Sequence, residues 1–168
     1  MSIPLHHATH LSQVLEPWIT PSLFYQFLGK GQSTTAMDSY TFCEVLGPEG
    51  GKAALQEHTA KWVQASDIAD LAKRGVQMVR VPVGDWLLAP YGPYVGCTEG
   101  QSDAVHWVLD ECQKHGIKVL LDIHAMRDSQ NGFDNSGRAR DVQWTDEHHF
   151  EHWPHLSASW VRSLSCLS

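Results

Sequence analysis

The stretch TAKWVQASDIADLAKRG at residues 59–75, followed directly by VQMVRVPV at 76–83, decides the fold class. Apolar residues in its first part recur at the spacing of one helix face, and a glycine ends it as glycines commonly end helices. We expect a strand in the second part. The same order returns in SDAVHWVLDECQKHG at 102–116, followed by IKVLLDIH at 117–124. Such alternation predicts an α/β fold with parallel strands and crossover helices.

Ionisable residues lie at the carboxyl ends of both predicted strands. Because side chains alternate along a strand, Asp122 and His124 share one face of the second strand, and Arg80 lies on the corresponding face of the first. The active sites of (β/α)8 barrels gather at the carboxyl ends of their strands. We therefore expect a barrel with these three residues facing its interior, and contact between Arg80 and Asp122. The alternative is that the two charges only pair to fill an interior layer.

Size and charge exclude several classes of function. The 168 residues, 42% of them hydrophobic, suffice for a single domain over 1–168. The formal net charge of -7 would repel a phosphate backbone, so we expect no nucleic-acid partner. No apolar run approaches the roughly 20 residues of a membrane span. The first 15 residues hold three histidines and show no signal-peptide pattern.

Metal and nucleotide sites are poorly supported. Neither G-x-G-x-x-G after a strand nor G-x-x-x-x-G-K-[ST] occurs. A histidine-rich segment contains His148, His149, His152 and His155, but no H-E-x-x-H is present, so surface histidines are the preferred interpretation. The four cysteines are scattered without a C-x-x-C pair, which leaves their pairing open. They are Cys43, Cys97, Cys112 and Cys166.

Three segments carry a family resemblance: VLEPWITPSLF at 14–24, VRVPVGDW at 79–86 and KVLLDIHAMRDSQNGFDNSG at 118–137. With the helix pattern between them, they resemble the fungal and oomycete exo-β-1,3-glucanases of glycoside hydrolase family 5 over roughly residues 14–145. The resemblance implies a truncated (β/α)8 barrel, with only the first three or so β/α units present. It also implies retaining hydrolysis of β-1,3-glucan from the non-reducing end, an extracellular or cell-surface location, and no metal or organic cofactor.

The resemblance also assigns roles to individual residues. Arg80 matches the family arginine that orients the nucleophilic carboxylate. His124 and Glu16 match residues that bind sugar hydroxyls, and Trp18 stands where the family has an aromatic residue. A carboxylate suits this work because it can accept from two adjacent hydroxyls.

A loop in the third segment supplies further substrate-binding candidates. They are Asn131, Phe133 and Asn135. The family places such residues where the next sugar subsite begins.

The chain departs from the family in three places. Relatives have a glycine-rich first strand where this chain has LHHATHLSQ. After the third strand relatives have H-G-A-P-G-S, whereas this chain has His124 followed by AMRDS. We therefore expect Arg127 and Asp128 to alter the backbone of the loop that follows this strand. The family takes its acid from an Asn-Glu-Pro turn and its nucleophile from a later glutamate. No N-E-P occurs, and Glu147 and Glu151 lie in the wrong local pattern. We expect no hydrolysis by this chain alone; the alternative is a non-catalytic fragment that binds β-glucan or a partner protein.

Overall fold

The computed structural model describes residues 8–11, 21–27, 36–140 and 142–144. Its strands form one parallel sheet in the order β1, β2, β3. They are β1 Ala8–His10, β2 Met78–Gly84 and β3 Lys118–Ala125. The α-helices are α1 Pro21–Phe24, α2 Ser39–Trp62, α3 Ala65–Lys73, α4 Tyr94–Cys97 and α5 Gln101–Lys114. Short 3-10 turns are η1 Tyr25–Phe27, η3 Asp85–Leu87 and η4 Asp134–Ser136.

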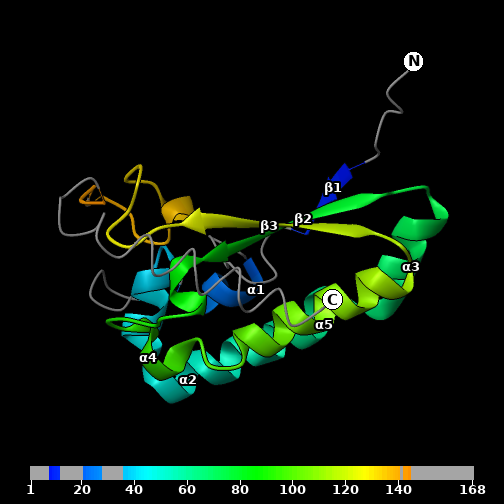
Figure 1. The fold of residues 1–168 in the computed structure, drawn as a ribbon. Coiled ribbons are helices and arrows are strands. Elements are labelled where there is room, and N and C mark those ends of the chain that lie inside the picture. The colour runs from blue at the N-terminus through cyan, green and yellow to red at the C-terminus, as the bar shows by residue number, and fades with distance from the viewer. Residues whose placement is uncertain (1–7, 12–20, 28–35, 141, 145–168) are drawn as a thin grey trace.

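The expected alternation of helices and parallel strands is confirmed. Helices α2, α3 and α5 lie on one side of the sheet, and the segment that follows β3 extends beyond the carboxyl ends of the strands (Figure 1). Glycines end the predicted helices as expected: Gly75 and Gly116 both take positive φ, +82° and +68°. The short strand β1 lies in the segment that lacks the family's glycine-rich pattern, and sequence reasoning did not assign it.

The prediction of one helix over residues 59–75 is wrong. Helix α2 ends at Trp62, and α3 begins at Ala65 after two extended residues. The cause is local capping: the Gln64 backbone N–H donates to an Asp67 carboxylate oxygen at 2.8 Å, which gives α3 its own amino terminus. An apolar face can continue across such a break because packing against the sheet, not helix continuity, selects its residues.

Other element boundaries differ from expectation by one or two residues: β3, for example, covers Lys118–Ala125 rather than 117–124. Strand β2 begins at Met78 rather than Val76, because the Val76 N–H still bonds to the Leu71 carbonyl at 3.1 Å and closes α3. Helix α5 begins at Gln101, one residue before the expected start, after Gly100 at φ +91°. Such shifts are common because helices and strands fray at their ends.

Alternation along β2 separates a helix-facing apolar side from a polar side. Val79, Val81 and Val83 are at most 1% exposed. They form a core with side chains from α3, α5 and the residue before β3, namely Ile68, Val105, Val108, Cys112 and Ile117. Arg80 lies on the opposite face, where a barrel has its interior.

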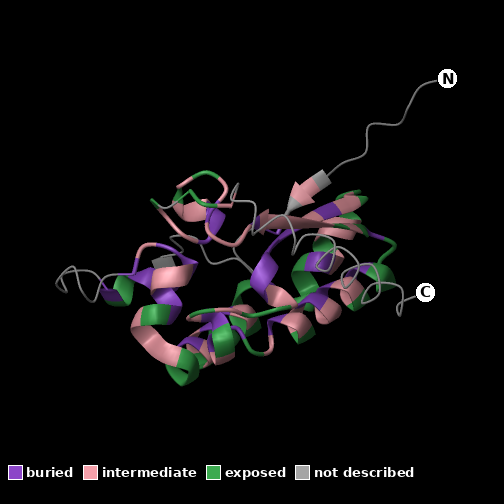
Figure 2. Cartoon of the chain, turned by 60° about the vertical axis from the view of Figure 1, so that its left-hand side comes forward, coloured by how far each residue is buried: buried purple, intermediate pink, exposed green. Residues whose placement is uncertain are grey.

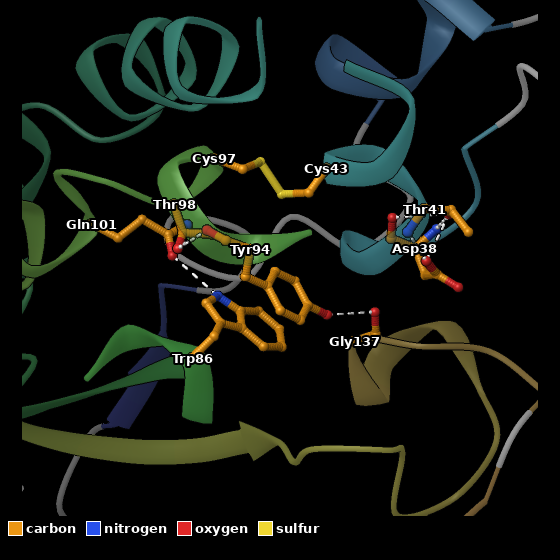
Figure 3. Close-up of a disulfide and its surroundings, with 9 residues drawn as sticks. All are labelled: Asp38, Thr41, Cys43, Trp86, Tyr94, Cys97, Thr98, Gln101 and Gly137. Atoms are coloured by element: carbon orange, nitrogen blue, oxygen red, sulfur yellow. Dashed lines mark hydrogen bonds between the residues drawn. A yellow bond between two sulfur atoms is a disulfide. The ribbon is translucent and has the colours of Figure 1, made fainter. Parts of the chain in front are cut away.

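A second, aromatic core joins α1, η1, α2 and α4 beneath the carboxyl end of the sheet. Phe24, Phe27 and Phe42 contact one another with ring centroids 5.5–6.0 Å apart. A disulfide between Cys43 in α2 and Cys97 in α4 crosses this core (Figure 3). Purple, buried segments accordingly line the space between the sheet and the helices in Figure 2.

Candidate functional site

Three side chains from β2 and β3 converge on the face of the sheet opposite the helices. The prediction that Arg80 lies at the carboxyl end of its strand is wrong, since it is the third residue of β2, whereas His124 lies next to the last residue of β3. A terminal nitrogen of Arg80, Nη2, donates to Asp122 Oδ2, and the same nitrogen lies 2.7 Å from His124 Nδ1. His124 Nδ1 is in turn 2.9 Å from Asp122 Oδ2. The register that pairs Pro82 with Asp122 brings the strands into this alignment. The predicted contact between Arg80 and Asp122 is confirmed.

Each of these side chains is partly accessible, with relative exposures of 26% for Arg80, 30% for Asp122 and 25% for His124. Arginine has only donors, so Nδ1 of a neutral His124 either accepts from Arg80 or donates to Asp122. In the first arrangement the ring hydrogen is on Nε2, which can then donate to a ligand oxygen. The cluster therefore presents a cation, a carboxylate and an imidazole that together can bind hydroxyl groups or a further carboxylate.

Residues 126–140 form a long loop after β3 that carries the other described candidates. Its tip is ordered by its own amides: Asn131 Nδ2 donates to Asn135 Oδ1 at 3.1 Å, and the Phe133 N–H donates to Asn131 Oδ1 at 2.9 Å. Phe133 is 68% exposed. The structure thus brings Asn131, Phe133 and Asn135 together at one tip, and Gln130 ties the loop to β3 by donating to the His124 carbonyl at 2.6 Å.

Two buried serines support this loop from within. The hydroxyls of Ser129 and Ser136 lie 2.5 Å apart, and the Gly132 N–H donates to Ser129 Oγ at 2.9 Å. Asp128 and Ser129 in this loop both take positive φ, +59° and +61°. A non-glycine residue with such a φ is uncommon and indicates a tightly determined turn.

Other candidates from the sequence lie outside the described residues. They are Glu16, Trp18, Glu147, Glu151, His148, His149, His152, His155 and Cys166. Within the part of the chain that the structure describes, no three His, Cys, Asp or Glu side chains gather as metal ligands would. No helix in that part is long and apolar enough to cross a membrane.

Sequence reasoning missed two features near the site. The pairing of Cys43 with Cys97 bridges 54 residues and has no spacing signature. Asp85, only 3% exposed, accepts the Arg127 N–H at 2.7 Å and the Tyr91 hydroxyl at 3.0 Å. Burial raises the pKa of Asp85 to about 6, although the two hydrogen bonds oppose this shift.

Known proteins share both the sequence and the fold. The chain is 42% identical over 133 residues to a glucan 1,3-beta-glucosidase of Blumeria graminis, and 44% identical over 134 residues to a probable glucan 1,3-beta-glucosidase A of Emericella nidulans. Both alignments cover 78% of this chain, which spans only about 30% of the relatives' length.

Among solved structures, rutinosidase from Aspergillus niger matches with a TM-score of 0.73 at 22% identity, over 90% of this chain and 42% of the other. That likeness supports the fold. The family described as Cellulase (glycosyl hydrolase family 5) matches residues 46–163. The chain therefore belongs to glycosyl hydrolase family 5.

Proposed function

We propose that this chain forms part of the sugar-binding site of a retaining exo-β-1,3-glucanase and contributes the first three or so units of its (β/α)8 barrel. The observation that carries the proposal is the convergence of Arg80, Asp122 and His124 on one face of the parallel sheet, with His124 next to the last residue of β3. The relatives named as glucan 1,3-beta-glucosidases support β-1,3-glucan as the substrate. The disulfide agrees with an extracellular or cell-surface location, because such bonds persist in oxidising compartments.

Each residue has a role within this proposal. Glu16 and His124 hold hydroxyls of the terminal glucose, with Trp18 beside them. Arg80 keeps the nucleophilic carboxylate of the complete barrel ionised and oriented, because a guanidinium can hold a carboxylate through two parallel hydrogen bonds. Asn131, Phe133 and Asn135 shape the next subsite.

The chain alone is proposed to bind glucan without cutting it. Retaining hydrolysis requires one acid and one nucleophile about 5 to 5.5 Å apart, and the chain contains neither the Asn-Glu-Pro turn nor a match for the later glutamate. This is the second candidate function, a non-catalytic glucan-binding fragment, and it is compatible with the first. The partner-binding alternative lacks a comparable cluster to support it.

The test uses purified chain with laminarin and with laminaritriose. We expect no glucose release from laminarin above a heat-inactivated control, and saturable binding of laminaritriose that Arg80→Met weakens. Glucose release above that control would contradict the inactivity of the chain. Absence of laminaritriose binding would contradict the proposed sugar site.

In a complete barrel, replacing a sugar-binding residue and replacing Arg80 are expected to have different kinetic effects. Glu16→Gln should raise KM, because a hydroxyl contact present in both ground and transition states is weakened. Arg80→Met should lower kcat by a factor on the order of 10² or more, as removal of one preorganised electrostatic partner does. An Arg80→Met enzyme with full kcat and reduced affinity would contradict this division of roles.

A further inference from the structure

The loop at residues 126–140 is anchored near its start to the segment after β2. The Arg127 N–H donates to Asp85 Oδ2 at 2.7 Å, and the guanidinium of Arg127 lies 4.0 Å from the centre of the Tyr91 ring. Tyr91 itself donates to Asp85 Oδ1 at 3.0 Å. The buried Asp85 carboxyl group therefore accepts hydrogen bonds from both the loop backbone and Tyr91, whose ring contacts the Arg127 guanidinium.

The far part of the loop is anchored to α2 and α4. The Gly137 carbonyl accepts from the Tyr94 hydroxyl at 3.0 Å and from the Tyr40 N–H at 2.8 Å. The Ala139 N–H donates to Asp38 Oδ2 at 2.8 Å, and Asp38 is 1% exposed. These contacts lie on the carboxyl side of the loop tip, so the tip is held from both directions.

Tyr94 is the most constrained of these anchors. Its ring stacks on Trp86 with centroids 4.0 Å apart and planes 13° from parallel, and it is 1% exposed. It belongs to the same short helix as Cys97, which the disulfide joins to Cys43 in α2. Figure 3 shows the Tyr94 hydroxyl reaching Gly137 from beside this crosslink. The two helices that hold the far end of the loop are thus covalently joined.

The tip between the anchors carries Asn131, Phe133 and Asn135. Because the Phe133 side chain is 68% exposed, its position follows from that of the loop backbone. A loop that must become ordered when a sugar binds loses affinity, whereas a loop already held in place does not. The anchors therefore control how well this tip can contact a sugar.

We propose that Tyr94 is a positioning residue for glucan, whose hydroxyl bond to Gly137 fixes the loop tip before the sugar binds. This inference rests on the proposed function and adds to it a residue that does not itself contact sugar. Its effect is confined to ligands long enough to reach the tip. A single glucose held at Arg80 and His124 is outside its influence.

The test compares Tyr94→Phe with Tyr40→Phe in the full chain. Tyr94→Phe removes one hydroxyl and keeps the stack on Trp86, and the Gly137 carbonyl retains the Tyr40 N–H, so the fold is expected to survive. Tyr40→Phe is the matched control: its ring lies 4.3 Å below the Arg138 guanidinium, and its contribution to Gly137 comes from the backbone. The probes are glucose and laminaritriose, titrated by calorimetry, together with amide hydrogen exchange at Gly132 and Phe133.

For Tyr94→Phe we expect faster exchange at the tip and about fivefold weaker binding of laminaritriose, the effect of losing one ordinary hydrogen bond. Glucose binding should be unchanged, and Tyr40→Phe should behave as wild type. A merely structural role would weaken both ligands together and would overturn the proposal. So would unchanged laminaritriose affinity in Tyr94→Phe. Failure of the wild-type chain to bind either sugar would instead overturn the proposed function, and this inference with it.

Discussion

Replacing Asp85 by Asn should change the pH dependence of stability. Burial raises the pKa of Asp85 from 3.8 to about 6, against the opposing hydrogen bonds from Arg127 and Tyr91. A shift of about two units corresponds to about 3 kcal/mol, at 1.36 kcal/mol per unit. Asn is similar in shape to the protonated carboxyl group and never carries the charge, so it isolates this contribution.

The sign follows from proton linkage. The folded chain holds a proton on Asp85 between about pH 3.8 and 6, where the unfolded chain releases it, so folding is favoured below this window and loses free energy as pH rises through it. The free energy of unfolding of the wild type relative to Asp85→Asn should therefore fall by about 2 kcal/mol between pH 4 and 7.5, because the unfolded carboxyl group is already partly ionised at pH 4. Net changes from other groups cancel in this difference.

The assay is urea unfolding followed by tryptophan fluorescence at both pH values, with the free energy extrapolated to water. Tyr91→Phe serves as a companion variant: it removes a donor that favours the charged carboxylate, so the transition should move to higher pH. If the difference in unfolding free energy between wild type and Asp85→Asn is the same at pH 4 and pH 7.5, then burial does not raise the pKa of Asp85 and the reasoning is refuted.

Two further predictions concern helix α2. The double variant Cys43→Ala with Cys97→Ala should lower the free energy of unfolding by about 4 kcal/mol, because the disulfide restricts the unfolded chain across 54 residues. Thermal melts should show this loss. Cys112→Ala is the control, since Cys112 is a free cysteine and its replacement leaves the contribution of the disulfide intact. Alanine at the two neighbouring glycines of α2 should change the free energy of unfolding in opposite directions. A Cβ at Gly51 would overlap Cys97 Sγ, so Gly51→Ala should destabilise the fold by about 1–3 kcal/mol. A Cβ at Gly50 meets its nearest atom at 3.5 Å, so Gly50→Ala should stabilise the fold by about 0.5–1 kcal/mol. Equal melting shifts for the two alanine variants would contradict this reading of the packing.

Local patterns predicted the parts of the fold that local physics determines. Strand alternation placed Arg80 and Asp122 on the same face of the sheet, and the structure joins them. Stop glycines located the ends of two helices. The break after Trp62 was missed because the apolar spacing continues through it, and only the Gln64 to Asp67 cap reveals it.

The rest of the site depends on contacts between distant segments. The Cys43–Cys97 pairing and the Asp85–Arg127 bond join residues more than 40 positions apart, and no spacing rule connects them. The resemblance did identify the AMRDS segment as unusual. The buried residue that accepts the Arg127 N–H, Asp85, could be recognised only once the carboxyl ends of β2 and β3 had been placed side by side.

The parallel sheet also has a consequence for the order in which the chain folds. Strand β2 pairs with β3 across 40 positions, from Met78 to Lys118, whereas β1 pairs with β2 across 70, from Ala8 to Met78. Bringing two distant strands together reduces the conformational entropy of the chain before their hydrogen bonds form, and this entropy loss grows with their separation in the sequence. We therefore expect β2, α5 and β3 to assemble first and the three residues of β1 to join last. Pulsed hydrogen exchange during refolding should show amides of β3 protected before those of β1.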